Sequence, residues 1–318
     1  MAEAYPWQQA LWQQLAGRSQ HAHAYLLHGP QGIGKRALAE RLMARLLCQQ
    51  PQGLNACGGC KSCLLLKAGS HPDNFVLEPE EADKPIKVDQ VRELVAFVVQ
   101  TAQLGGRKVV LIEPVEAMNV NASNALLKSL EEPSGDTVLL LVTHQPSRLL
   151  PTIKSRCRQF PLTAPAADVA LAWLQQQGMA NAASELAFHG GMPVFVHDAE
   201  LAAVRDDFIA SLTQLGMGSV LSAMEKLDRH KLPLAVPLSW LGKWLHDLAS
   251  LKLAGMVRYY PDRQPALERL LPRLDLAQLM HCQRELNLLL PFGQHTLVTR
   301  LQLEALLMHY LKVISGKN

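Results

Sequence analysis

A glycine-rich pattern at residues 29–36 constrains the fold more than any other feature of the sequence. It reads Gly-Pro-Gln-Gly-Ile-Gly-Lys-Arg, which contains the G-x-x-x-x-G-K core of a phosphate-binding loop. The apolar residues before it are typical of a buried strand, and Leu38, Leu42 and Leu46 after it share one face of a helix. A strand, a tight glycine turn and a helix in this order predict the opening of an α/β domain.

Alternating strand and helix patterns continue to about residue 163. Three further short, continuous apolar runs are typical of strands covered on both faces of a parallel sheet. These runs begin at Asn74, Lys108 and Thr137. Helical patterns separate them at residues 88–103 and 121–133, and Pro133 ends the second. The sequence therefore predicts a doubly wound α/β P-loop domain with a parallel sheet over residues 1–163.

The residue composition and the hydrophobic pattern of the sequence change after this domain. Strand-like runs largely vanish, and Ala, Leu and Gln dominate a series of helical stretches interrupted by prolines. The Gly-Gly-Met-Pro segment after His189 indicates a break within a small helical unit. From ordinary domain sizes we predict a small helical lid at residues 164–208 and an all-α domain at residues 209–318.

The composition indicates a multidomain protein of the cytoplasm. With 318 residues, 48% of them hydrophobic, the chain can bury the cores of two or three domains. No apolar run approaches the roughly 18 residues needed to span a bilayer, and residues 1–15 lack the basic-then-apolar layout of a signal peptide. We expect no membrane partner. The net charge of +3 is spread along the chain, so any DNA contact is expected to depend on assembly with other proteins.

Four of the six cysteines crowd into one segment, at about residues 48–63. Cys48, Cys57, Cys60 and Cys63 have the spacing C-x8-C-x2-C-x2-C, among glycines and other turn residues. Thiolates at two-residue intervals can close a tetrahedron around Zn²⁺, and four filled positions favour a structural site. In a reducing cytoplasm such crowding favours a metal over disulfides. An iron–sulfur cluster and reactive redox cysteines are the alternatives.

The phosphate loop lacks its usual metal ligand. The backbone at Gly29, Gly32 and Gly34, together with the side chain of Lys35, could hold phosphate groups. The next position is normally a Ser or Thr whose hydroxyl binds Mg²⁺. Arg36 stands there instead, and a guanidinium has only donors and a permanent positive charge. The sequence therefore indicates a damaged metal site.

A second defect follows the apolar run that begins at Lys108. The run ends in Glu113-Pro114, where an active ATPase of this kind has Asp-Glu. Glu113 is one methylene longer than the metal-positioning aspartate, and Pro114 has no carboxylate to orient an attacking water. ATP hydrolysis is therefore not expected. Two interpretations stay open for the loop: passive binding of ATP, and a glycine turn with no ligand.

Several strings occur in the order of a known family. They are HAYLLHGPQGIGK from His23, the cysteine spacing, IKVDQVREL from Ile86, NALLKSLEEP from Asn124, and Ser155-Arg156-Cys157. Together they resemble the clamp-loader subunits of bacterial DNA polymerase III, a family of the AAA+ class. In that family the gamma and tau subunits combine the cysteine cluster with intact ATP sites. Because of Arg36, Glu113 and Pro114, this chain is similar to the delta prime type instead.

The resemblance implies a function and its partners. It implies a non-hydrolysing subunit of a DNA-directed DNA polymerase holoenzyme, which assists ATP-driven loading of the sliding clamp onto primed DNA. It implies a ring with gamma or tau and delta subunits, held together by a helical collar at residues 209–318. By the same resemblance Arg156 is an arginine finger for the ATP of a neighbouring subunit. Thr143 falls at the family's polar sensor, and Pro193 falls where active relatives have a nucleotide-sensing arginine.

Two other functions stay open. An active gamma-type clamp-loader ATPase would hydrolyse ATP as the isolated chain. A free-standing zinc-containing nucleic-acid-binding protein would bind DNA alone, although the cysteine cluster lacks interleaved aromatic and basic residues. On the residues alone, Arg156 is also compatible with an ordinary surface arginine near a strand end.

Overall fold

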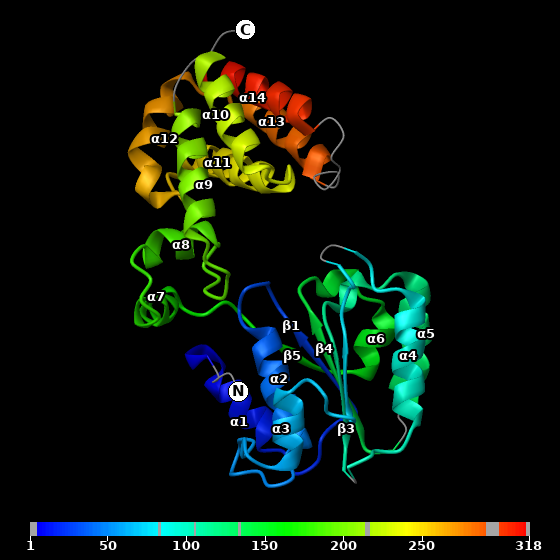
Figure 1. The fold of residues 1–318 in the computed structure, drawn as a ribbon. Helices are drawn as coiled ribbons and strands as arrows, with labels where there is room; N and C mark the ends of the chain where they lie inside the picture. The colour runs from blue at the N-terminus through cyan, green and yellow to red at the C-terminus, as the bar shows by residue number, and fades with distance from the viewer. Residues whose placement is uncertain are drawn as a thin grey trace. The chain divides into compact units, whose positions relative to one another are not determined.

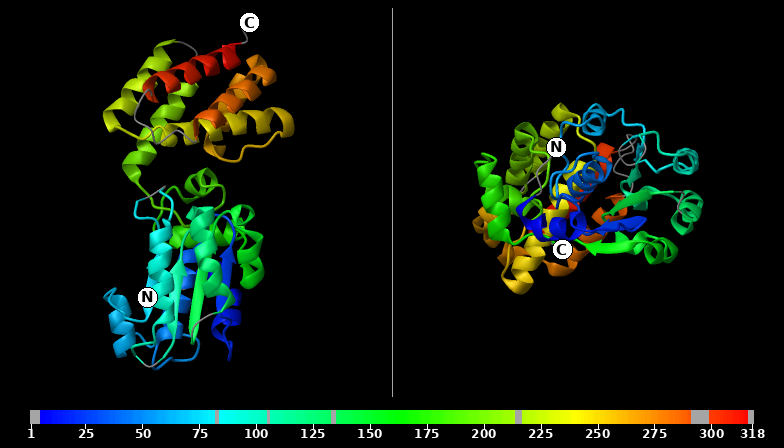
Figure 2. Two further views of the ribbon diagram at one scale, coloured as in Figure 1. Left: turned by 90° about the vertical axis from the view of Figure 1, so that its right-hand side faces the viewer. Right: turned by 90° about the horizontal axis from the view of Figure 1, so that it is seen from below.

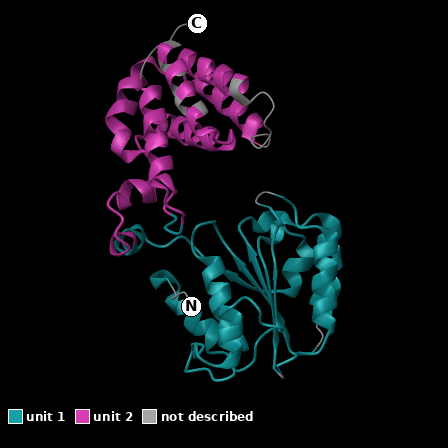
Figure 3. Ribbon diagram, viewed as in Figure 1, with its two compact units in different colours: residues 1–173, 192–194 teal, residues 174–191, 195–318 magenta. Residues whose placement is uncertain are grey.

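The computed structural model describes residues 5–81, 84–104, 106–132, 135–213, 217–290 and 299–315. They divide into two compact units, residues 1–173 with 192–194 and residues 174–191 with 195–318 (Figure 3). The domain boundaries expected after residues 163 and 208 stay predictions.

The first unit is built on a parallel sheet (Figure 1). Its strands are β1 (Ala24–His28), β2 (Asn74–Leu77), β3 (Lys108–Ile112), β4 (Thr137–Thr143) and β5 (Arg158–Pro161). Within the described residues their order is β2-β3-β4-β1-β5, and every neighbouring pair is parallel. β3 and β4 are buried at every position, in agreement with their continuous apolar sequences. The prediction of burial on both faces was wrong for β2, which lies at the edge of the sheet and buries only Leu77. The prediction of a doubly wound α/β fold is confirmed.

Helices cover both faces of this sheet (Figure 2). They are α1 (Gln9–Ala16), α2 (Lys35–Leu47), α3 (Lys61–Lys67), α4 (Val88–Val99), α5 (Val120–Glu131) and α6 (Pro151–Arg156), with short 3-10 helices η1 (Pro6–Gln8), η2 (Val115–Ala117) and η3 (Pro146–Arg148). Leu26 and Val110 pack with α4, α5 and α6, whereas Leu27 and Val109 pack with α1 and α2. Neighbouring residues of a strand therefore pack into two separate hydrophobic cores, one on each face of the sheet. Pro133, predicted to end α5, lies outside the described residues.

The sequence patterns did not predict β5. Of its four residues only Phe160 is buried, and the strand lies at the edge of the sheet beside β1. An edge strand has a single neighbour and tolerates a proline, here Pro161. Its sequence therefore lacks the apolar run that identified the other strands.

All the regular elements among the described residues of the second unit are helices. Its elements are the end of α7 (Ala167–Gln176), α8 (Ala182–Phe188), α9 (Ala199–Leu212), α10 (Met217–His230), α11 (Ala235–Ala254), η4 (Pro261–Arg263), α12 (Gln264–Leu270), η5 (Leu271–Arg273), α13 (Leu276–Leu289) and α14 (Thr299–Ser315). Trp244 lies fully buried at its centre and donates to the Tyr310 hydroxyl at 2.8 Å. The helical character expected from the sequence is confirmed. No helix among the described residues has the length and apolar character needed to cross a membrane.

Candidate functional site

Residues 29–34 form the glycine turn between β1 and α2. Gly34 precedes the helix with a φ of 83°, a conformation that glycine adopts without strain. A Cβ at Gly34 would lie 2.2 Å from the ring of Tyr5, and a Cβ at Gly29 would lie 2.1 Å from the carbonyl oxygen of Leu162. The turn therefore needs glycine because other groups approach its backbone closely.

The carbonyl groups of this turn already have donors from the same chain. The Ile33 carbonyl accepts from Nε1 of Trp7 at 3.0 Å and from Nε2 of Gln8 at 2.8 Å. The backbone amide of Val194 donates to the carbonyl of Gly32 at 2.9 Å. Two segments that are distant in the sequence thus hold the turn, and neither was predicted to do so.

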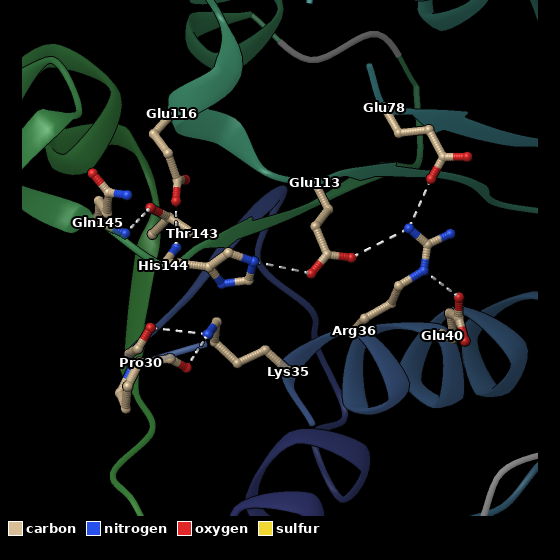
Figure 4. A network of polar contacts seen from close by, with 11 residues as sticks. Pro30, Lys35, Arg36, Glu40, Glu78, Glu113, Glu116, Thr143, His144 and Gln145 are labelled. Carbon is tan, nitrogen blue, oxygen red and sulfur yellow. Dashed lines mark hydrogen bonds and ion pairs between the residues drawn. The ribbon is translucent and has the colours of Figure 1, made fainter. Parts of the chain in front are cut away.

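Lys35, the lysine of the motif, lies in the first turn of α2 and points back at the glycine turn (Figure 4). Its Nζ donates to the carbonyl oxygens of Gly29 at 2.9 Å and Pro30 at 2.5 Å. Burial lowers the pKa of the amine to about 8, although the charges of Glu113 and Glu116 oppose this. A phosphate would have to draw the lysine away from these two carbonyls.

Arg36 binds three carboxylates beside the turn (Figure 4). Its Nε lies 2.8 Å from an oxygen of Glu40, and its Nη1 lies 2.7 Å from Glu78 and 3.3 Å from Glu113. The Glu113 side chain is only 11% exposed. Burial raises the pKa of Glu113, and the nearby charge of Arg36 opposes that rise. The guanidinium thus supplies to these carboxylates the positive charge that Mg²⁺ supplies in active P-loop ATPases.

These groups line an open cleft of 700 Å³. Nε2 of His144 lies 3.8 Å from an oxygen of Glu113, and the backbone amide of His144 donates to Oε1 of Glu116 at 2.7 Å. Oε1 of Glu116 is therefore hydrogen-bonded to the backbone directly after β4. Pro114 also lines the cleft and, as predicted, brings no carboxylate. Pro114 therefore cannot orient an attacking water, as a glutamate at this position would.

Several residues of this network, among them Glu78 and Glu116, were not predicted from the sequence. Glu78 directly follows β2, and Glu116 lies in η2, so the strand order of the folded sheet is what brings them to Arg36 and His144. A position directly after an expected strand is the signal that could have identified Glu78. Thr143 is fully buried, and its hydroxyl accepts a hydrogen bond from the amide of Gln145 at 3.2 Å. Its role as a sensor stays a prediction.

The four cysteines predicted to bind a metal lie together. Their Sγ atoms all lie within 4.8 Å of one another. Cys48 and Cys57 are 3.6 Å apart at sulfur, and the Cys48–Cys60 and Cys57–Cys63 separations are both 4.0 Å. Four thiolates at the usual Zn–S distance of about 2.3 Å in a tetrahedron would be about 3.8 Å apart. The cluster can therefore hold a tetrahedral metal ion with little rearrangement.

Backbone amides support the thiolate form of Cys57 and Cys60, whereas burial raises the pKa of Cys63 to about 12. The amide of Cys57 donates to Sγ of Cys48 at 3.2 Å, and the amide of Cys60 donates to Sγ of Cys57 at 3.3 Å. Burial raises the pKa of Cys60, but hydrogen bonds from the amides of Cys63 and Gln49 outweigh it and lower the pKa to about 6. A metal needs deprotonated thiols, so these amides favour binding.

Arg156 ends α6, just before the start of β5, whereas the phosphate loop follows the other end of the neighbouring strand β1. β5 begins two residues later at Arg158, which pairs with Tyr25 near the start of β1. Because the two strands are parallel, about four strand residues, on the order of 13 Å, separate these positions. The structure thus does not bring Arg156 to the loop of its own chain.

The Arg156 side chain is fixed by its neighbours but remains accessible. Its Nη2 lies 2.5 Å from an oxygen of Glu131, its Nη1 donates to the Thr152 carbonyl at 3.0 Å, and one third of it is exposed. Burial raises the pKa of the adjacent Cys157 thiol to about 12, which makes this cysteine a core residue rather than a nucleophile. Ser155 is exposed. Of the Ser-Arg-Cys motif, Ser155 and Arg156 are therefore accessible, and the role of Arg156 as an arginine finger stays a prediction.

Comparisons with known proteins agree with these features. Residues 6–166 match the family model described as DNA polymerase III, delta subunit. The chain is 55% identical to DNA polymerase III subunit delta' of Pseudomonas aeruginosa, over 83% of this chain and 86% of that protein. It is 35% identical to the subunit of the same name from Yersinia pestis, over 93% of each chain. A DNA polymerase III gamma subunit-related protein from Thermotoga maritima covers 96% of this chain and 98% of its own at 17% identity, with a TM-score of 0.49.

Proposed function

The chain belongs to the delta prime family of DNA polymerase III subunits, and on this basis we propose that it is a non-hydrolysing subunit of a clamp loader. In this role it joins gamma or tau and delta subunits in a ring in the cytoplasm. The ring uses ATP to load the sliding clamp onto primed DNA. This chain supplies Arg156 to the ATP site of a neighbouring gamma or tau subunit.

The observation that carries the proposal is the ion-pair network of Arg36. Phosphoryl transfer depends on Mg²⁺ and on precise positioning of an attacking water. Arg36 and its contacts with Glu113 and Glu78 put a tethered cation in competition with that metal. Lys35 is hydrogen-bonded to the loop itself. Hydrolysis would need several groups to rearrange, so we assign the chain no ATPase activity of its own.

The position of Arg156 supports its action on another subunit. An arginine that cannot reach its own loop, yet is held and partly exposed, is suited to a partner's nucleotide. The ion pair with Glu131 already restricts the conformations of the Arg156 side chain before binding. Less conformational entropy is therefore lost when the guanidinium contacts a phosphate. A planar, permanently charged guanidinium stabilises the charge of the transferring phosphoryl group.

We assign Zn²⁺ to the cysteine cluster as a structural ion. The sulfur separations fit tetrahedral coordination, and all four ligand positions are filled by protein, which leaves none for a substrate. The ion would hold Cys48, Cys57, Cys60 and Cys63 and so tie the segment after α2 to α3. No catalytic step involves it.

Reconstituted clamp loading tests the proposed function. Purified gamma-type and delta subunits should load the sliding clamp onto primed DNA efficiently only when this chain is added. Loading that proceeds equally well without it would refute the proposal. Binding of primed DNA by the isolated chain, tested across salt concentrations, would instead favour the free-standing nucleic-acid-binding protein.

Replacing Arg36 by threonine should make the cleft responsive to Mg²⁺. The change removes the tethered cation, returns a hydroxyl, and leaves Glu113 and Glu78 without their partner. Two unpaired carboxylates beside a hydroxyl favour a hard divalent cation. We expect ATP binding in the presence of Mg²⁺ to tighten by about tenfold or more over wild type, as measured by equilibrium binding of a fluorescent ATP analogue.

The matched control is Arg92→Thr. It removes an exposed arginine on α4 that forms an ion pair with Asp89 at 2.8 Å. It should bind the nucleotide as wild type does. If Arg36→Thr and Arg92→Thr behave alike with and without Mg²⁺, the Arg36 network does not exclude the metal.

A further inference from the structure

A second group of metal-ligating side chains lies on the surface of the second unit, far along the chain from the cysteines. His281 and Glu285 stand one turn apart on α13, and His309 stands on the adjacent α14 (Figure 1). One ligand atom from each residue lies within 4.8 Å of the other two. Nδ1 of His281 lies 3.8 Å from Oε2 of Glu285, and Nδ1 of His309 contacts the same oxygen.

Ordinary His–Glu pairs elsewhere in this unit are simpler. His230 lies 3.5 Å from Glu200, and His189 lies 3.8 Å from Glu185, which also binds Arg205 at 2.5 Å. Among the described residues, each of these carboxylates forms an ion pair with one histidine. At α13 and α14, two imidazoles from different helices converge on one carboxylate oxygen. Hydrogen bonding alone needs only one of the two histidines, whereas a metal site needs both.

We propose that His281, Glu285 and His309 form a binding site for a divalent transition-metal ion, and that the bound ion is Zn²⁺. Two imidazole nitrogens and one carboxylate oxygen suit Zn²⁺, Ni²⁺, Co²⁺ and Cu²⁺, whereas Mg²⁺ and Ca²⁺ prefer oxygen ligands throughout. Ligands at about 2.0–2.1 Å from zinc in a tetrahedron lie about 3.3 Å apart. The three side chains are partly exposed, and their ligand atoms already lie within 4.8 Å of one another.

The site would join the last two helices of the chain. α13 and α14 pack against each other, and the ion would add a direct bond between their exposed faces. Three protein ligands leave the fourth position to water, so the ion would exchange readily, unlike one enclosed by four cysteines. Binding to the folded unit alone would stabilise it by an amount that grows with the logarithm of metal concentration above the dissociation constant. This inference does not depend on the proposed clamp-loader function.

Cobalt titration of the full chain tests the site. The protein is prepared with its cysteine cluster loaded with zinc and is then titrated with Co²⁺, followed by absorbance. We expect one further equivalent to bind, with weak d–d bands and none of the intense near-ultraviolet absorption of cobalt thiolates. Zn²⁺ should displace it and should raise the thermal midpoint of unfolding.

Three variants make the assignment specific. His281→Ala and His309→Ala should each lower the affinity for the additional Co²⁺ ion by about tenfold or more. Each should also abolish the zinc-dependent rise in the thermal midpoint of unfolding. His230→Ala removes a histidine from a simple His–Glu pair and should change neither result. The His281 side chain is 57% exposed, so its replacement tests the site even if His309→Ala fails to fold.

Three results would each overturn the proposal. The first is the absence of a further equivalent in the wild type. The second is a further equivalent that His281→Ala leaves unchanged. The third is cobalt bound with thiolate absorption, because that would place it in the cysteine cluster.

Discussion

Replacing Arg156 by alanine is expected to remove one ATP site from the rapid hydrolysis phase of the assembled clamp loader. An arginine finger contributes about 10³–10⁵-fold to the rate of phosphoryl transfer at its site. The site facing this chain would therefore become too slow to take part in the first turnover. The amplitude of the rapid phase, measured by quenched flow with clamp and primed DNA, should fall by the amount of one site while the others continue.

Assembly should survive this substitution. The Arg156 side chain is partly exposed and contacts only Glu131, Ser155 and the Thr152 carbonyl, so its loss leaves both cores of the first unit intact. Arg156→Lys should restore little, because an ammonium retains the charge without the planar fork. Arg158→Ala, which removes a neighbouring arginine from β5, serves as the matched control. An unchanged amplitude with Arg156→Ala would reduce this residue to a structural one.

Replacing Cys60 by serine is expected to release the zinc and unfold the segment around residues 48–63. Apart from the zinc, this segment is held by the buried Ser62, which donates to the Leu47 carbonyl at 2.6 Å, and by Arg41, which donates to Asn55 at 2.7 Å. Its backbone pairing outside helices is a bridge between Gln52 and Asn55, and most of its residues are exposed or half-buried. Structural zinc contributes about 10–16 kcal/mol of binding free energy in zinc-finger peptides near neutral pH. Loss of one thiolate of four should therefore disorder the segment locally.

Metal analysis and hydrogen exchange measure this effect together. The Cys60→Ser protein should lose its zinc and exchange its amides rapidly in this segment, whereas the sheet stays protected because Leu38 and Leu42 of α2 pack on it independently of the cluster. Cys157→Ser alters a buried cysteine outside the cluster and, after dialysis that removes readily exchanging ions from both proteins, should retain one zinc per chain, whereas Cys60→Ser should retain none. Iron in place of zinc would contradict the assignment of the metal, and slow exchange in Cys60→Ser would contradict its structural role.

The strands of this fold could be predicted where burial on both faces imposes a continuous apolar sequence. β3 and β4 are such strands. β5 is not, because it buries only Phe160 and is recognised through its pairing with Tyr25–His28 at the other end of the domain's sequence. A local pattern carries no information about such a distant partner. The same reason explains why the contacts of Trp7 and Gln8 with the phosphate loop could not be predicted.

The candidate site could be predicted as far as sequence spacing alone defines it. Lys35, Arg36 and Glu113 follow from the motif and from the end of an apolar run, and the cysteine spacing identifies its four residues. The spacing does not reveal that Arg36 binds Glu113 and Glu78, because that contact depends on the order of β2 and β3 in the sheet. Nor does it reveal that Arg156 lies opposite its own loop, which follows from the register of β1 and β5.

ATP hydrolysis by the isolated chain tests the central claim of this account most directly. Radiolabelled ATP and Mg²⁺ would be incubated with the purified wild-type chain and, as a control for contaminating ATPases, with Lys35→Ala. We predict that the two proteins release phosphate at the same background rate, because Arg36 holds the carboxylates that an active site would offer to Mg²⁺. Turnover by the wild type that Lys35→Ala abolishes would contradict the account and make the chain an active gamma-type ATPase.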